Sequence, residues 1–278
     1  GKIPGELGQI QGIESLALSR NALEGAIPEE FGNFVNMTGL YLDGNSLTGA
    51  IPSSLLRCQS LTHLFLESNE FYGDLPSELG RWQHMKILQL SQNQLTGEIP
   101  SSLCQMASLE GLLLDENQFR GQIPSCVGQL PELLVLDLSW NQLTGKIPRL
   151  ANLHMRHLDF EGNNLSGQIS KDLGQLRQLY HLRLSHNRLE GELPLELGAL
   201  EKLRYLYLND NKILGEIPPS FGQMLELSVM SLAHNNLQGR IPPELGQLQK
   251  LTLLDLGHNQ LSGGIPPELG QLGNLLAL

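Results

Sequence analysis

Two groups of aromatic and charged residues stand at equivalent positions of a repeated pattern, and they could form a binding surface. The larger group contains Asp137, Trp140, His157, Asp159, Glu161, His181, Arg183, Tyr205 and Tyr207, with Tyr180 and Arg204 at its edge. The smaller group contains Tyr41, His63 and Phe65 with Asp43 and Glu67. Aromatic side chains and arginine beside carboxylates are typical of the residues that dominate protein interfaces. We therefore predict that both groups bind a peptide or protein partner. The structural alternative is that aromatic side chains stacked along a sheet only stabilise it.

Patterns that indicate catalysis or cofactor binding are missing from the sequence. It contains neither a GxxxxGK[ST] phosphate loop nor a GxGxxG pattern after a strand, and no serine or cysteine stands with a histidine and a carboxylate at a recognisable spacing. Four residues, His186, Asp210, His234 and His258, occupy equivalent positions in successive repeats. A metal could bind such a column, but the residues form no tight ligand cluster, and solvated side chains at a rim are the favoured interpretation. We expect no enzyme activity, no cofactor and no metal.

The repeat that must position these residues is marked by an asparagine every 24 residues. The series is Asn21, Asn45, Asn69, Asn93, Asn117, Asn141, Asn163, Asn187, Asn211, Asn235 and Asn259. One step, from Asn141 to Asn163, is 22 residues, because the segment from Pro148 to Met155 is two residues shorter than its equivalents. A fixed period of this length indicates a solenoid of stacked repeats.

Each repeat reads as a short strand followed by a turn and a return segment. Leu61, Leu64 and Leu66 alternate with polar or aromatic residues, which predicts a strand with one face buried. Asn69 follows and should turn inward, where its amide can pair with the backbone of neighbouring coils. The segment 77–80 indicates a short 3₁₀ turn on the back of the coil. The strands should therefore form one parallel sheet whose outward positions carry the binding residues.

The pattern LxxLxLxxNxLxGxIPxxLGxL resembles the plant-type leucine-rich repeat over the whole chain, with eleven complete motif rows and partial ones at both ends. The resemblance implies a β-rich α/β fold: a right-handed leucine-rich-repeat solenoid with a parallel β-sheet on the concave face and 3₁₀ or short helical segments on the convex face. We predict a single solenoid domain over residues 1–278. The Gly-x-Ile-Pro signature is typical of extracellular domains of plant receptor-like kinases, receptor-like proteins and polygalacturonase-inhibiting proteins.

The net charge and the hydropathy pattern argue against several classes of partner. The net charge of −11 argues against nucleic acid and against anionic membrane surfaces. The longest apolar runs, such as 133–136, fall far short of the roughly 18 residues that cross a bilayer. Because the chain starts and stops inside a repeat without polar caps, we expect it to be a fragment of a longer protein.

The cysteines and two sequons favour the extracellular side. Cys104 and Cys126 lie on the convex segments of adjacent coils, which stack roughly 5 Å apart, and receptor-like proteins of the resembled family often carry a similar pair. We therefore predict a disulfide between them, and a buried thiol at Cys58. Asn36 and Asn164 begin sequons and are candidate glycosylation sites, although Asn164 also fits ordinary repeat chemistry.

Together these features favour the extracellular ligand-binding segment of a receptor-like kinase or receptor-like protein, with a peptide or protein bound on the concave face. One alternative is a secreted inhibitor of a cell-wall-degrading hydrolase, and another is a structural repeat array without a signalling role. Ice binding is disfavoured because it requires a flat array of matched side chains, whereas the outward columns here are heterogeneous.

Overall fold

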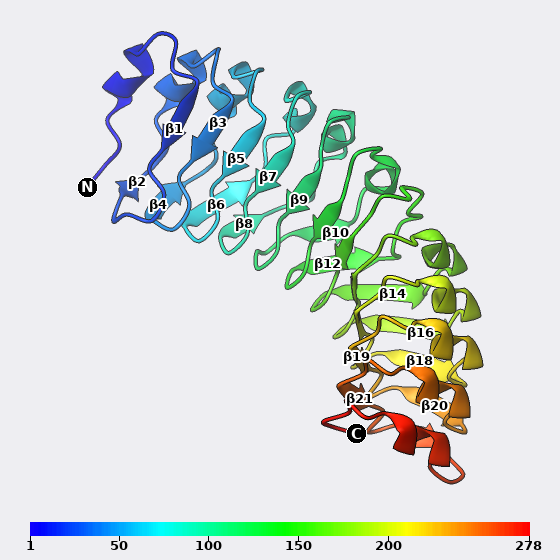
Figure 1. Ribbon diagram of the computed structural model, residues 1–278. Helices are drawn as coiled ribbons and strands as arrows, with labels where there is room; N and C mark the ends of the chain where they lie inside the picture. The colour runs from blue at the N-terminus through cyan, green and yellow to red at the C-terminus, as the bar shows by residue number, and fades with distance from the viewer. The chain divides into compact units, whose positions relative to one another are not determined.

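The computed structural model describes residues 1–278, which form two compact units, Gly1–Leu143 and Thr144–Leu278. Within each unit, Figure 1 shows short strands running side by side and short helices along a separate edge. All of the helices are 3₁₀ helices of three to five residues. The fold is therefore a stack of similar coils, as the repeat predicts; whether the chain forms a single domain stays a prediction.

The principal strands of each unit form a parallel sheet in chain order. In the first unit they are β1 (Ser15–Ala17), β3 (Gly39–Tyr41), β5 (His63–Phe65), β7 (Ile87–Gln89), β9 (Gly111–Leu113) and β11 (Val135–Asp137). In the second unit they are β13 (His157–Asp159), β15 (His181–Arg183), β17 (Tyr205–Tyr207), β19 (Val229–Ser231) and β21 (Leu253–Asp255). Equivalent residues of neighbouring repeats are paired, for example Tyr41 with Phe65 and Arg183 with Tyr207. Outward side chains therefore stand in columns.

A second set of short strands follows the turns. It comprises β2 (Glu24–Gly25), β4 (Ser46–Gly49), β6 (Glu70–Asp74), β8 (Gln94–Thr96), β10 (Arg120–Gln122), β12 (Gln142–Gly145), β14 (Asn164–Gln168), β16 (Arg188–Glu192), β18 (Lys212–Gly215), β20 (Asn236–Gly239) and β22 (Gln260–Leu261). The 3₁₀ helices are η1 (Gly5–Gln9), η2 (Glu29–Asn33), η3 (Ser53–Arg57), η4 (Leu79–Arg81), η5 (Ser101–Gln105), η6 (Ser125–Gln129), η7 (Lys171–Gln175), η8 (Leu195–Ala199), η9 (Pro219–Gln223), η10 (Pro243–Gln247) and η11 (Pro267–Gln271).

The core of each coil is a set of aliphatic and aromatic side chains closed by the asparagine ladder. Leu64 and Leu66 are completely buried, as is Phe71 after the turn. The Nδ2 group of Asn69 donates to the carbonyl oxygens of Leu42 at 3.0 Å and Leu66 at 3.1 Å, and its Oδ1 accepts the backbone N–H of Leu47 at 2.9 Å. Each ladder asparagine thus pairs backbone groups that the turn would otherwise leave unsatisfied in the interior.

The residue before each ladder asparagine lies in the left-handed region of backbone conformation. Nine of these residues are not glycine and have φ between 50° and 55°: Arg20, Ser68, Gln92, Glu116, Trp140, His186, Asp210, His234 and His258. Glycines occupy this position in the other two coils, with φ of 63° at Gly44 and 67° at Gly162. A turn that must reverse the chain within one residue accounts for this strained conformation, which histidine and aspartate tolerate better than most side chains.

The coil after Asn141 differs from the others in its return segment. A 3₁₀ helix occurs in every other coil, but none forms between η6 and η7, where the chain is two residues shorter. In its place the side chain of Asn152, itself buried, accepts the backbone N–H of His154 at 2.8 Å. The deletion seen in the sequence therefore removes one short helix.

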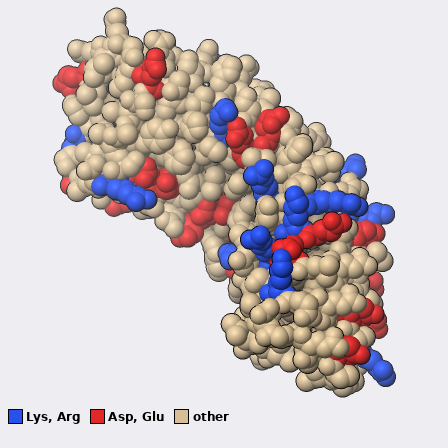
Figure 2. Space-filling model, viewed as in Figure 1, with Lys and Arg blue, Asp and Glu red and all other residues tan.

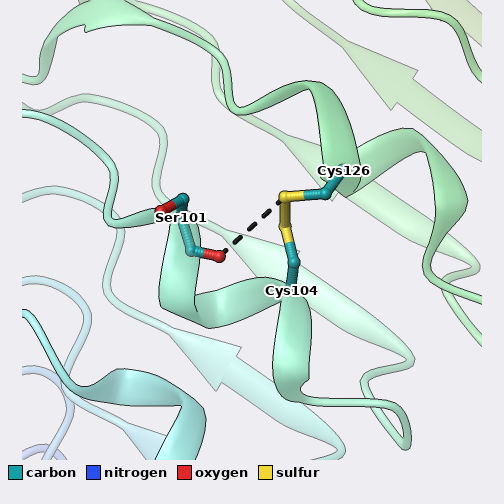
Figure 3. Close-up of a disulfide and its surroundings, with 3 residues drawn as sticks. All are labelled: Ser101, Cys104 and Cys126. Carbon is teal, nitrogen blue, oxygen red and sulfur yellow. Dashed lines mark hydrogen bonds between the residues drawn. A yellow bond between two sulfur atoms is a disulfide. The ribbon is translucent and has the colours of Figure 1, made fainter.

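The predicted disulfide between Cys104 on η5 and Cys126 on η6 is present, with Cα atoms 5.8 Å apart (Figure 3). Cys126 Sγ also lies 3.9 Å from the carbonyl oxygen of Ser101; because a disulfide sulfur carries no hydrogen, this is a contact and not a hydrogen bond. Cys58 is buried and free, and its thiol donates to the carbonyl oxygen of Phe31 at 3.2 Å. Burial raises the pKa of Cys58 to about 11, which keeps it an unreactive thiol.

None of the helices is long and apolar enough to cross a membrane.

Candidate functional site

The smaller predicted group lies on β3 and β5 of the first unit. The rings of Tyr41 and Phe65 stack with centroids 5.3 Å apart and planes inclined by 26°, and His63 lies beside Phe65 at 6.4 Å. Tyr41, His63 and Phe65 are all half-buried, so their exposed edges remain accessible to a partner. The structure therefore brings together the aromatic residues that the sequence grouped.

Asp137 and Trp140 of the larger group belong to the first unit. Asp137, at the end of β11, accepts two hydrogen bonds from Ser139, one from the backbone N–H at 3.0 Å and one from the hydroxyl at 2.7 Å. Trp140 occupies the left-handed turn position and is 51% exposed, which is unusual for so large an apolar side chain. The other seven members of the group lie in the second unit.

Three of these members form a row across the second unit. His157 Nδ1 lies 2.9 Å from His181 Nδ1, so one imidazole donates and the other accepts. The ring of His181 in turn lies 4.5 Å from that of Tyr205, centroid to centroid. The first outward column of β13, β15 and β17 is thus a continuous row of rings.

Arg183 and its neighbours form the charged half of the same surface. Arg183 Nη1 lies 3.7 Å from both Asp159 Oδ2 and Glu161 Oε2, and its guanidinium carbon is 4.8 Å from the centre of the Tyr207 ring. The arginine side chain remains 41% exposed. Opposite charges beneath it and an aromatic ring beside it restrict its rotamers, so it is presented in a defined position.

Asp159 is buried, although its outward position in the repeat predicted that it would contact a partner. It is only 3% exposed, and its Oδ1 accepts the backbone N–H of Glu161 at 3.0 Å. A carboxylate this deep has little surface for a partner. Its contacts with Arg183 and with the chain after β13 make it a positioning residue beneath the surface.

His181 is held in its neutral form. Burial, together with the electrostatic effect of His157, Arg183 and Arg204, lowers the pKa of His181 to about 4. At pH values above about 4 its ring therefore serves as an uncharged hydrogen-bonding and stacking group beside Tyr205.

His186 belongs to this surface as well, although the sequence pattern assigned it to a solvated rim. Its Nε2 lies 3.9 Å from Glu161 Oε1 and its Nδ1 lies 3.5 Å from Asp210 Oδ2. His186 follows Arg183 by three residues, at the turn after the strand. The register of the repeat therefore already predicts its position at the edge of the strand face. Further along the same column, His234 and His258 stack with ring centroids 4.0 Å apart.

The two sequons differ in accessibility. Asn36 is exposed in the turn after η2. Asn164 lies on β14, where it is half-buried and its Oδ1 accepts a hydrogen bond from Arg188 Nη2 at 2.7 Å. Of the two candidate glycosylation sites, Asn36 is therefore the better placed in the folded chain.

One hollow of the second unit lies away from these residues. It measures about 1590 Å³, opens to solvent and is lined by the second set of strands and the starts of the 3₁₀ helices, including Glu190, Glu192, Leu195, Leu214 and Glu216. None of the predicted binding residues lines this hollow.

Charge is distributed unevenly between the two units. Residues 1–143 contain 16 aspartates and glutamates but only 6 lysines and arginines, whereas residues 144–278 contain 13 and 12. On the face drawn in Figure 2, the basic side chains gather mainly on the second unit. The acidic character of the protein therefore resides in the first unit.

Stacked coils with short parallel strands, 3₁₀ returns and an asparagine ladder define a class of repeat proteins whose surface serves recognition. Family models described as leucine-rich repeat region and leucine-rich repeat match residues 141–278 and 11–71, and further leucine-rich repeat models match residues 84–106 and 130–147. The chain belongs to the leucine-rich repeat family. No curated protein sequence matches it significantly.

Several solved structures are similar. A TDR receptor is 33% identical, with a TM-score of 0.92, over 96% of this chain and 47% of that one. The plant peptide hormone receptor RGFR1, solved in complex with RGF2, is 30% identical, with a TM-score of 0.80, over 100% of this chain and 52% of the receptor chain. A plant ice-binding protein is 30% identical, with a TM-score of 0.77, over 90% of this chain and 82% of the ice-binding protein. The chain thus spans about half the length of the two receptors.

Proposed function

We propose that this chain is a non-catalytic recognition segment of an extracellular plant-type receptor, and that it binds a peptide or protein on the outward strand face. In the second unit the surface is formed by His157, His181, Arg183, Tyr205, Tyr207, Glu161 and His186. The first unit has outward residues of its own, Tyr41 and Phe65 on β3 and β5 and Asp137 and Trp140 at β11 and the turn after it. Similarity to a plant peptide hormone receptor supports this class of ligand, and the disulfide supports an extracellular location.

The observation that carries the proposal is the fixed but exposed Arg183. A guanidinium held by two carboxylates and a ring has already lost much of its conformational freedom, so less entropy is lost when a partner binds. Because its side chain remains 41% exposed, its free N–H groups can donate to a carboxylate or backbone carbonyl of the partner. Tyr205 and the imidazole row beside it supply apolar contact area.

The test is a triple variant, Arg183→Ala with Tyr205→Ala and Tyr207→Ala, measured against peptides selected for binding to the unmodified chain. We expect the affinity to fall at least about a hundredfold, because such residues dominate interface energetics. The matched control is Tyr72→Ala with Arg240→Ala, two exposed residues away from the strand face, which should bind as the unmodified chain does. Unchanged affinity in the triple variant, with its circular dichroism spectrum intact, contradicts the proposal.

Ice binding, the function in the name of one relative, is the less favoured function for this chain. Successive outward residues from β13 to β21 in one column are Asp159, Arg183, Tyr207, Ser231 and Asp255. The column alternates between charged, aromatic and hydroxyl side chains, so it does not present a regular array of similar groups. Thermal hysteresis in a solution of the chain would reverse this preference.

A further inference from the structure

The first unit presents carboxylates and aromatic rings together in two outward columns that contain no lysine or arginine. We name as the acidic–aromatic strip the residues Tyr41, Asp43, Phe65, Glu67 and Asp115. The two outward columns that contain the strip read Ala17, Tyr41, Phe65, Gln89, Leu113 and Asp137, and then Ser19, Asp43, Glu67, Ser91, Asp115 and Ser139. The one nearby cation is Arg20, whose Nε lies 4.0 Å from Asp43 Oδ2 and whose side chain is 89% exposed. An ion pair with so exposed an arginine contributes little to stability.

Glu67 is the member of the strip that keeps one carboxylate oxygen without a hydrogen-bond partner. Its Oε2 is buried and has no hydrogen-bond partner, whereas Asp43 accepts from the hydroxyl of Ser19 and Asp115 from that of Ser91. Burial raises the pKa of Glu67, and the charges of Asp43 and Asp115 raise it too. A buried acceptor without a donor is costly, and a cationic donor would relieve both the missing hydrogen bond and the charge repulsion.

The second unit shows what this combination of residues binds. Glu161 occupies the same column as Glu67, and Tyr207 the same column as Tyr41 and Phe65. There the guanidinium of Arg183 lies between the ring of Tyr207 and the carboxylates of Asp159 and Glu161. The strip has carboxylates in the column of Glu161, at Asp43 and Glu67, and rings in the column of Tyr207, at Tyr41 and Phe65. It has no arginine in either column and no carboxylate in the place of Asp159.

We propose that the acidic–aromatic strip binds an arginine side chain of a peptide or protein partner, with the guanidinium donating to Glu67 and Asp43 and stacking against Tyr41 or Phe65. The inference rests on the proposed function, because it assigns the ligand chemistry of one part of the strand face. The excess of 16 acidic over 6 basic residues in this unit also attracts a basic segment at long range. Arginine suits the site better than lysine because its planar group can stack and donate two hydrogen bonds at once.

The probe is a short glycine–serine peptide with a single arginine, titrated into isotope-labelled protein and followed by NMR at low ionic strength. The comparison peptides carry lysine or citrulline, which has nearly the shape of arginine but no charge. We expect shifts centred on β3 and β5 and an affinity about tenfold lower for Glu67→Gln, because a charge-assisted hydrogen bond is lost. Equal affinity for the arginine and citrulline peptides overturns the proposal.

Two further variants separate the strip from general acidity and from the second unit. Glu70→Gln removes an equal charge from an exposed position on β6 and should leave the affinity within about twofold. Tyr41→Leu together with Phe65→Leu should abolish the preference for arginine over lysine, because both rings that can stack on the guanidinium are removed while the electrostatic attraction is kept. If Glu70→Gln weakens binding as much as Glu67→Gln does, the strip is not the site. The triple variant of the second unit should keep full affinity for the arginine peptide, so failure of the two proposals can be told apart.

Glu67→Gln is suitable for this test because it should not unfold the protein. Since the folded state disfavours the charged carboxylate, removing the charge should raise the free energy of unfolding at pH 7. Weaker arginine binding together with higher stability is the result that marks Glu67 as a ligand-binding residue. A variant that binds the arginine peptide as tightly as the unmodified chain overturns the proposal.

Discussion

The histidines of the second unit show that one residue type has two roles on the same surface. His181 is kept neutral by burial beside Tyr205, whereas His186 lies at the edge within 4 Å of two carboxylates. The difference follows from their positions, since His181 is inside the strand and His186 occupies the turn before the ladder asparagine. A recognition surface with both kinds of histidine combines ring stacking with polar contacts to carboxylates.

The lowered pKa of His181 predicts how stability depends on pH. The unfolded chain binds a proton at this residue below about pH 6.5, whereas the folded chain does so only below about pH 4. The free energy of unfolding should therefore fall as pH is lowered through this window. Urea denaturation at pH 6.5 and at pH 4.5 measures this decrease in the free energy of unfolding. The decrease should be smaller in His181→Gln than in the unmodified chain, whereas His84→Gln, at an exposed position, should show the full decrease. An identical pH dependence in both variants contradicts the assignment.

The asparagine ladder is the element on which each coil depends. Asn187 Nδ2 donates to the carbonyl oxygens of Phe160 at 2.8 Å, Ser185 at 3.0 Å and Leu184 at 3.2 Å, while Oδ1 accepts the N–H of Leu165 at 3.0 Å. One side chain thus satisfies backbone groups of two coils. This arrangement explains why the sequence repeats asparagine itself, because neither leucine nor aspartate offers both donors and an acceptor.

Asn187→Ala should destabilise the coil strongly. It leaves the N–H of Leu165 and several carbonyl oxygens unsatisfied in the interior, so the free energy of unfolding should fall by about 3 kcal/mol. The exposed Asn33, at the end of η2, supplies the control, and Asn33→Ala should change stability by less than about 0.5 kcal/mol. Chemical denaturation of both variants distinguishes the ladder from an ordinary asparagine.

At the scale of the whole molecule, each coil is stabilised chiefly by the coils next to it. Stability in such a chain is approximately a sum of local contributions, so a defect should be felt mainly by its neighbours. The disulfide is a covalent cross-link between two coils, and it joins residues 22 apart in the sequence. Its contribution should accordingly be local.

Replacing both cysteines, Cys104→Ser with Cys126→Ser, should lower protection from hydrogen exchange by about 3 kcal/mol around η5 and η6, the amount expected for a closed loop of this length. Amides of β17 and β19 should keep their protection, because they lie several coils away. Loss of protection spread evenly over the chain would instead indicate a single cooperative unit.

The sequence by itself determined the coil. The 24-residue period, the alternating leucines and the asparagines predicted the strands, the turns and the register, because each repeat meets the same packing and hydrogen-bonding demands. It also brought Tyr41 beside Phe65 and His181 beside Tyr205, since columns follow directly from register. Only the tertiary structure decided which outward residues remain available: Asp159 lies beneath Arg183, Asn164 is paired with Arg188, and Glu67 keeps an oxygen without a donor. These outcomes depend on side-chain rotamers and on the size of neighbouring groups, which a period cannot specify.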